Sequence, residues 1–185
     1  MKPYPTLLAI LAGLALAAVT GCGDKDAPED SHEDAPSTTA IDPRIDAVFL
    51  EQKPEGAVSV VQARKSVEPG TTLTVTGRIA GVLHPFSVDY ATLVLADDSI
   101  QTCERIPGDE CPTPWDACCV EPETLAAGRL TIQVVDEEGL PLGTSLKSVN
   151  GLKELDSLVI TGEVAEGSNP TNLIINASGI YAVSN

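Results

Sequence analysis

Hydrophobic and polar residues alternate along a stretch near the middle of the chain. Leu73, Val75 and Ile79 are separated by threonine, glycine and arginine, and a period of two over about ten residues predicts a strand with one buried face. Gly77 and Gly81 fall on the apolar phase of this strand. Glycine at such positions is typical of a strongly coiled or bulged strand, as a small barrel requires.

Four further segments have strand-like patterns, and a short helical pattern precedes the last two. The apolar phase of the last segment shifts across Ser178 and Gly179, which predicts a β-bulge there. An entry helix and a strand or extended lead-in precede the first strand. The four further strands are expected at residues 91–96, 130–134, 158–164 and 173–183, the short helix at 149–155, the entry helix at 45–50 and the lead-in at 58–63.

The order of three strands, a short helix and two strands is that of an OB-fold, a five-stranded Greek-key barrel. The segment Leu73–Gly81, with the sequence LTVTGRIAG, resembles the coiled first strand of such barrels. An immunoglobulin-like sandwich is the competing architecture, but it would require about seven strands. We therefore expect one all-β domain with a short helix over residues 47–185, and a cysteine-rich insertion at 98–128 between the second and third strands.

The N-terminus carries a targeting signal. Lys2 precedes an apolar run of about a dozen residues, too short to cross a bilayer of about 30 Å as a helix. The run ends in Val19–Cys22, with the sequence VTGC, and this resembles the lipobox of bacterial lipoproteins. The resemblance implies cleavage of residues 1–21, acylation of Cys22 and anchoring to the lipid bilayer on the periplasmic or outer face of the cell envelope. The alternative is an ordinary secretory signal with a chance cysteine.

Charge limits the functions that the exported chain can have. Residues 22–46 are rich in acidic residues and proline, which predicts an extended tether. Residues 47–185 hold nineteen acidic and eight basic residues, a net charge of −11, and aromatic residues make up only 3% of the chain. Single-stranded nucleic acid binding needs a basic groove and stacking aromatics. Nucleic acid is therefore not an expected partner.

The insertion concentrates the cysteines and the only tryptophan of the chain. Its motifs resemble an uncharacterised family of exported bacterial proteins known mainly from planctomycete genomes. That family has no assigned activity, so the resemblance implies location and architecture alone. The matching residues are Cys103, Ile106–Asp109, Cys111, Thr113–Asp116 and Cys118–Cys119, followed by Val134–Asp136 and Gly151–Leu152.

Two disulfides are the expected use of these four cysteines, because the exported compartment is oxidising. A bond between the neighbours Cys118 and Cys119 would need a strained ring. The two remaining pairings join this dipeptide to Cys103 and Cys111. In an extended segment adjacent side chains point in opposite directions, so one dipeptide would connect two parts of the loop. Trp115 is expected to anchor the loop by packing rather than to bind a ligand.

A metal or thiol-redox site is the alternative. The same four cysteines, with His84, would bind zinc or copper(I) as thiolates. Their spacing of seven, six and zero intervening residues does not match the paired knuckles of structural zinc sites, and the loop has no Cys-x-x-Cys motif. Calcium binding by Asp109 and Glu110 is a further alternative, although these acids match no EF-hand.

Catalysis has little support in the sequence. A nucleophile–base pair would have to use His84, because His32 lies in the tether. No glycine-rich phosphate loop or zinc-protease motif is present. The sequence therefore predicts an envelope lipoprotein without enzymatic activity or cofactor, which binds or scaffolds an envelope protein or a small ligand.

Overall fold

The computed structural model describes residues 41–65 and 68–184, which belong to a compact unit formed by Thr39–Asn185. The predicted signal peptide, Cys22 and most of the acidic tether lie outside these described residues. Within the described part of the chain, no helix has the length and apolar character needed to span a membrane.

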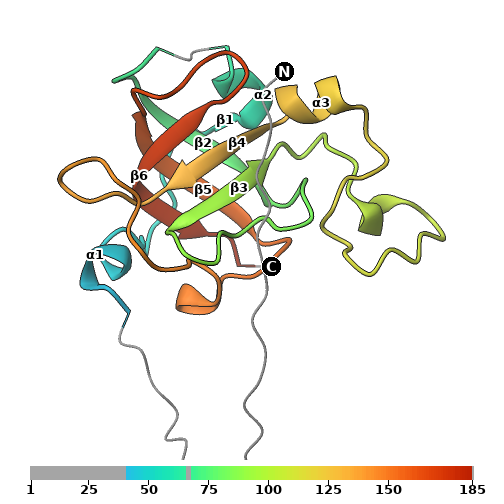
Figure 1. Ribbon diagram of the computed structural model, residues 1–185, viewed down its shortest axis with the longest axis horizontal. Coiled ribbons are helices and arrows are strands. Elements are labelled where there is room, and N and C mark those ends of the chain that lie inside the picture. The colour runs from blue at the N-terminus through green and yellow to red at the C-terminus, as the bar shows by residue number, and fades with distance from the viewer. Residues whose placement is uncertain (1–40, 66–67, 185) are drawn as a thin grey trace, which may run out of the picture. The chain divides into compact units, whose positions relative to one another are not determined.

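The centre of the fold is a closed five-stranded barrel (Figure 1). The strands pair in the order β2-β3-β4-β6-β5, and β5 pairs again with β2 to close the ring. All neighbours are antiparallel except β4 and β6, which are parallel. The barrel strands are β2 (Thr72–Ile79), β3 (Thr92–Ala96), β4 (Arg129–Gln133), β5 (Ser157–Val164) and β6 (Ile174–Ala182).

This topology confirms the OB-fold-like prediction. Counted from the first barrel strand, the order around the ring is first, second, third, fifth, fourth, and back to the first, as in an OB-fold Greek-key barrel. The two-residue strand β1 (Val58–Ser59) adds to β2 in parallel. The five predicted barrel strands all form, with ends shifted by a few residues.

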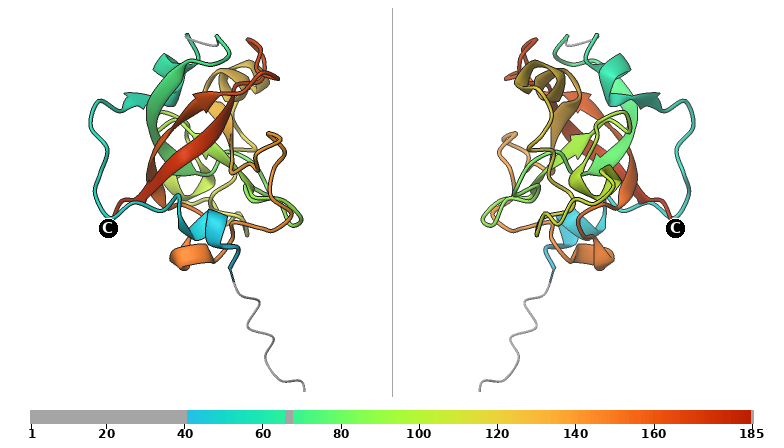
Figure 2. Two further views of the ribbon diagram at one scale, coloured as in Figure 1. Left: turned by 90° about the vertical axis from the view of Figure 1, so that its left-hand side faces the viewer. Right: turned by 90° about the vertical axis from the view of Figure 1, so that its right-hand side faces the viewer.

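Short helices surround the barrel. They are α1 (Pro43–Asp46), α2 (Val60–Ala63), the 3₁₀ turn η1 (Cys103–Arg105), α3 (Pro122–Ala127) and the 3₁₀ turn η2 (Val149–Gly151). The helix expected at 149–155 is confirmed as η2, although it is shorter than predicted. In Figure 2, α1 and η2 lie together at one end of the barrel, where Asn150 contacts Asp46 at 3.5 Å.

The ordered domain begins earlier than residue 47. Asp42 caps α1 by accepting the backbone N–H of Arg44, and Pro43 occupies the first helical position, where proline is favoured. Ile45 is fully buried in the barrel core. The last residues assigned to the tether therefore belong to the folded domain, and the entry helix lies two residues before the predicted start.

The lead-in at 58–63 is only partly extended. Ser59, the second residue of β1, is also the N-cap of α2. Its hydroxyl and the Gln62 side chain form a reciprocal capping box. The pattern Ser-x-x-Gln is a known helix-start signal. This signal lies within the segment that was predicted to be extended.

The predicted bulge in the last strand is confirmed. Thr161 pairs with Gly179, whereas Gly162 pairs with Ala177, so Ser178 is the extra residue. The bulge lets Ile175 and Ile180 both face the core although they are five residues apart.

Gly77 permits a close strand contact rather than a bulge. A Cβ atom at this position would lie 2.5 Å from the carbonyl oxygen of Ala96 in β3. Just after Gly77, β2 pairs with β3 through Arg78–Ala96 and Ile79–Leu95, while Arg78 still pairs with β5 on its other side. The glycine therefore serves barrel closure, as its place on the apolar phase suggested.

Aliphatic side chains fill the barrel interior, and a second, smaller cluster lies outside it. The outer cluster has Ala80, Ala96, Ile100 and Ala117 at its centre. It joins the ends of β2 and β3 to the insertion between β3 and β4, which occupies the predicted place and lies to one side of the barrel (Figure 1). The cysteine loop, the part of this insertion from Cys103 to Cys119, is therefore packed against the barrel.

Candidate functional site

Trp115 joins the cysteine loop to the barrel. Its side chain is partly buried against the outer apolar cluster. The indole Nε1–H donates a hydrogen bond of 3.0 Å to the carbonyl oxygen of Leu83, and the backbone N–H of Gly81 donates one of 2.9 Å to the carbonyl of Trp115. These contacts hold the middle of the loop on the segment that follows β2.

The two halves of the loop are also bonded to each other. The backbone N–H groups of Cys103 and Glu104 donate to the carbonyls of Asp116 and Pro114, at 2.8 and 3.0 Å. The carboxylate of Glu104 accepts a hydrogen bond of 2.6 Å from Arg78 of β2, in a partly exposed ion pair. The start of the loop is therefore fixed both to its own far side and to the barrel.

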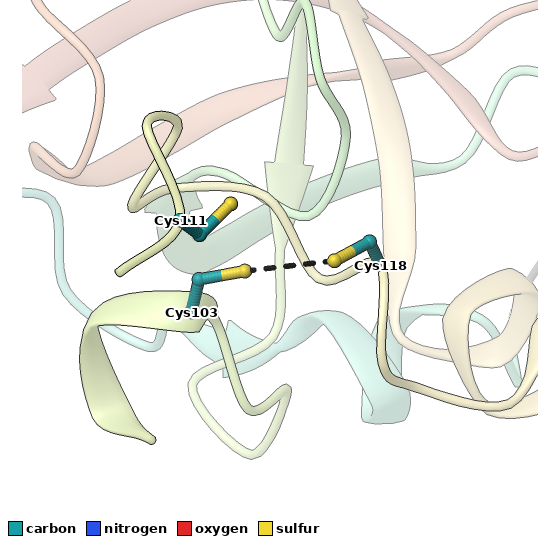
Figure 3. A group of neighbouring side chains, drawn as sticks. All are labelled: Cys103, Cys111 and Cys118. Atoms are coloured by element: carbon teal, nitrogen blue, oxygen red, sulfur yellow. Dashed lines mark hydrogen bonds between the residues drawn. The ribbon is translucent and has the colours of Figure 1, made fainter. Parts of the chain in front are cut away.

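This arrangement brings three sulfur atoms together. The Sγ atoms of Cys103, Cys111 and Cys118 all lie within 4.8 Å of one another. Figure 3 shows the three side chains converging from separate parts of the loop, with the Sγ atoms of Cys103 and Cys118 at 3.8 Å. Cys103 is buried, Cys111 is half-buried and Cys118 is exposed.

The predicted disulfides are not present among these residues. All four cysteines are free thiols, and the 3.8 Å between the sulfurs of Cys103 and Cys118 is well beyond the roughly 2.05 Å of a bond. The disulfide prediction therefore stays a proposal. The sulfurs are close enough for small side-chain rotations to join them.

The expectation that Cys118 and Cys119 point in opposite directions is wrong. Their Sγ atoms are 3.8 Å apart. The expectation assumed an extended backbone, whereas the dipeptide lies in a turn in which Val120 N–H bonds to Ala117 O at 3.0 Å. In a turn the alternation of strand side chains does not apply.

The thiols differ in their tendency to ionise. Burial raises the pKa of Cys103 to about 12, so this thiol stays protonated at neutral pH. The pKa of Cys111 is lowered, chiefly because the Thr113 hydroxyl contacts its sulfur at 3.4 Å. The hydrogen bond with Cys118 raises the pKa of Cys119. Of Cys103, Cys111 and Cys119, Cys111 is therefore the thiol that its surroundings make easiest to ionise.

The three convergent sulfurs fit a soft metal ion. Two thiolates about 2.3 Å from a shared tetrahedral zinc lie about 3.8 Å apart, which matches Cys103 and Cys118 at 3.8 Å. Copper(I) also accepts thiolate ligands. Cys119 and His84, the other two candidate ligands, are not part of this group among the described residues.

His84 lies elsewhere, exposed on the wall of a hollow of about 420 Å³ that also includes Ser87, Lys147 and Glu154. Lys147 bonds to Glu154 at 2.7 Å. Ser87 Oγ accepts the backbone N–H of Tyr90 at 3.2 Å. Ser87, Lys147 and Glu154 therefore form these hydrogen bonds with groups other than His84.

The calcium alternative named Asp109 and Glu110. Asp109 Oδ1 accepts the N–H of Cys111 at 2.9 Å, a contact that shapes a turn of the loop. Neither Asp109 nor Glu110 belongs to a cluster of potential ligands within the described residues. Asp116, a further acid of the loop, likewise makes a local contact, because its Oδ1 accepts the N–H of Ala117 at 2.8 Å.

Sequence reasoning missed Asp97, which begins the insertion. It is only 7% exposed, and its carboxylate accepts the N–H of Val61 at 2.9 Å and both the N–H and the hydroxyl of Ser99 at 3.0 and 2.7 Å. Burial alone would raise the pKa of Asp97, but these hydrogen bonds bring it below the ordinary value. No local pattern marks this contact, because Val61 is far away in the chain.

Comparisons with known proteins add little to this description. No known family model matches the chain, and no curated protein matches it. Among solved structures it is similar to the hypothetical protein ygiW from E. coli, with 18% sequence identity and a TM-score of 0.35 over 70% of this chain and 94% of that one. The OB-fold-like assignment rests on the strand order described above.

Proposed function

We propose that this protein is a lipid-anchored lipoprotein of the bacterial cell envelope, and that its barrel is a non-enzymatic binding or scaffolding module. The lipobox-like sequence Val19–Cys22 supports the anchor. Acylation at two positions of Cys22 would hold the protein stably in a bilayer, because a single chain gives only marginal binding.

The observation that carries the binding role is a loop held on the outside of a packed barrel. Large aliphatic side chains, including Leu93, Ile132, Leu158 and Ile175, are completely or almost completely buried inside it. The barrel interior therefore offers no room for a ligand, and any ligand or partner must contact the outer face and the loops. The cysteine loop is a large and rigidly attached part of that outer surface.

Metabolic labelling with a palmitate analogue tests the anchor. We expect the wild-type chain and a Cys119→Ala control to incorporate the label and to sediment with membranes. A Cys22→Ala variant should remain unlabelled. A wild-type protein that is unlabelled and released in soluble form would refute the proposed lipoprotein.

A cross-linked pull-down from envelope membranes tests the binding role. The full chain is compared with a variant in which residues 104–117 are replaced by a short glycine–serine linker. We expect the wild type to retain a specific envelope protein or small ligand that the variant loses. If the two recover the same background material, the cysteine loop is not the binding surface.

A metal-binding or thiol-redox role of the loop is the second candidate, and the convergence of three sulfurs favours it. As a metal site, the loop would lose binding in the Cys103→Ser, Cys111→Ser and Cys118→Ser variants but keep it in Cys119→Ser. As an oxidised loop, it would form the disulfides Cys103–Cys118 and Cys111–Cys119. Cys103 can pair with Cys118 or Cys119, and the Sγ atom of Cys118 already lies 3.8 Å from that of Cys103.

The mass of the exported, non-reduced protein separates these outcomes. Two disulfides lower the mass by four hydrogen atoms relative to the reduced chain. Four free thiols together with stoichiometric zinc or copper support the metal site, and four free thiols without metal remove both uses of the loop.

A further inference from the structure

Within residues 41–65 and 68–184, two arginines of this acidic protein lie without an acidic partner. Three of the five arginines in the chain, Arg44, Arg78 and Arg105, form ion pairs with carboxylates. No described carboxylate lies within salt-bridge distance of Arg64 or Arg129. In a chain of net charge −16, two adjacent cations without a carboxylate are unexpected.

Both arginines line the same hollow on the outside of the barrel. The hollow has a volume of about 270 Å³, close to the lower end of the roughly 300–1,000 Å³ typical of small-ligand sites. Its walls come from β3, β4, α3 and the loop between β5 and β6, and Figure 1 shows where these elements lie in the fold. Besides the two arginines, the lining residues include Val82, Val94, Leu130, Thr131 and Thr171.

Backbone carbonyls hold the guanidinium groups in place. Arg64, which follows α2, donates to the carbonyls of Arg129 and Pro170 at 2.8 and 2.7 Å. Arg129, at the start of β4, donates to the carbonyl of Gly81 at 3.2 Å. A guanidinium has five N–H donors, so both arginines keep donors for another group. Carbonyl contacts orient the cations without neutralising them.

The pairing of two cations is unfavourable unless an anion joins them. Burial and the positive charge of Arg129 both lower the pKa of Arg64. Arginine nevertheless stays charged at neutral pH, so the repulsion between the two groups persists. An oxyanion between the guanidinium groups would offset this repulsion and accept their remaining hydrogen bonds, often in bidentate geometry.

We propose that the hollow between Arg64 and Arg129 binds the oxyanion of a small organic ligand, a phosphate or a carboxylate. The apolar side chains of Val82 and Val94, which line the hollow and are partly exposed, would contact the organic part of the ligand. This inference rests on the proposed role of the barrel as a binding module and names the chemical class of its ligand.

Isothermal titration of the full chain in detergent, at constant ionic strength, tests the site. The probes are inorganic phosphate, phenyl phosphate and benzoate, with benzyl alcohol as the neutral control. We expect phenyl phosphate or benzoate to bind and benzyl alcohol not to bind. The stronger of these two probes distinguishes a phosphate from a carboxylate ligand. The affinity should fall as the salt concentration rises.

Two variants test the arginines in different ways. Arg129→Gln removes one cation, and Thr171→Glu adds an exposed carboxylate at the rim without removing either arginine. Each should weaken binding by about tenfold or more, because hydrogen bonds to charged groups are strong. Arg44→Gln, which removes the same charge from an exposed ion pair at α1, should bind like the wild type.

The outcomes separate this site from the anchor. Binding that is lost in Arg129→Gln and Thr171→Glu but kept in Arg44→Gln supports the site. No heat with any of the three anions, or equal affinity in all variants, overturns it. Palmitate labelling of the same variants is independent of the hollow, so a failed anion site with normal labelling leaves the lipoprotein proposal standing.

Discussion

Replacing Asp97 by asparagine should destabilise the domain although the two side chains have nearly the same shape. One carboxylate oxygen accepts the backbone N–H of Val61 in α2, and the other accepts two hydrogen bonds from Ser99. Asparagine has only one acceptor oxygen. If that oxygen stays with Ser99, the new amide group faces the N–H of Val61, and the contact between the insertion and α2 is lost.

The magnitude follows from the lost contact. A hydrogen bond to a charged group contributes about 1.5–3 kcal/mol, and a buried donor left without an acceptor costs about 1–3 kcal/mol. Both ranges describe the same broken hydrogen bond and are not added, so we expect the free energy of unfolding to fall by about 2 kcal/mol. This is a large fraction of the roughly 5–15 kcal/mol stability of an ordinary domain. It corresponds to a fall in Tm of about 4–8 °C for a domain of this size.

Urea unfolding followed by the fluorescence of Trp115, the only tryptophan of the chain, measures this loss. The matched control is Asp98→Asn. The Asp98 side chain is 78% exposed in an ion pair with Arg105, and an exposed pair contributes only about 0–1 kcal/mol. The control should therefore change the free energy of unfolding much less than Asp97→Asn.

The pH dependence gives a second, independent check. The pKa of Asp97 is lower in the folded state than the ordinary value of an aspartate, so its ionised form stabilises the fold above that ordinary value. This contribution is lost as the pH falls through the lowered folded pKa. The wild type and Asp97→Asn should therefore differ fully at pH 7, and the difference should shrink as the pH falls below about 4 and vanish only below the lowered folded pKa. A difference that is the same at pH 7 and pH 3, or a loss no larger than that of Asp98→Asn, would refute the reasoning.

The other predictions concern the thiols, barrel closure and the loop anchor. Iodoacetamide at pH 7 should modify Cys111 before Cys103, as read by peptide mass spectrometry under reducing conditions, because the pKa of Cys103 is about 12 and that of Cys111 is lowered. Gly77→Ala should cost about 1–3 kcal/mol in urea unfolding, since its Cβ would lie 2.5 Å from a carbonyl of β3, whereas Gly167→Ala, with its nearest neighbour at 3.9 Å, should cost little. Trp115→Ala should make the loop the first site of limited proteolysis, because the indole is both packed and hydrogen-bonded; unchanged cleavage would contradict its role as an anchor.

The barrel could be predicted because its sequence signals are local. Alternation marks β2 over a continuous run, and the phase shift at Ser178 marks the bulge without any knowledge of β5. The order of the elements then leaves few ways to close a five-stranded sheet. The start of the domain was misplaced because the burial of Ile45 depends on the finished barrel, and the acidic residues around it are typical of a tether.

The geometry of the candidate sites could not be predicted in the same way. The sequence identifies four cysteines, but it does not show that Cys118 and Cys119 lie in a turn or that Cys111 joins Cys103 and Cys118. Those facts depend on how the loop folds back on itself and onto the barrel. Arg64 and Arg129 are separated by the whole insertion, so neither has a local pattern that indicates the other.

The cysteine loop and the arginine hollow form one connected structural unit. The backbone N–H of Gly81 donates to the carbonyl of Trp115, and the carbonyl of Gly81 accepts from Arg129. Gly81 has a positive φ of 85°, a conformation that glycine adopts without strain. A change of the loop on oxidation or metal binding that displaced Trp115 would therefore act on the residue that positions Arg129. If the loop and the hollow are coupled in this way, metal binding in the loop changes the free energy of anion binding in the hollow. Anion binding must then change the free energy of metal binding by the same amount. The thiol state of the loop therefore has to be fixed whenever binding in the hollow is measured.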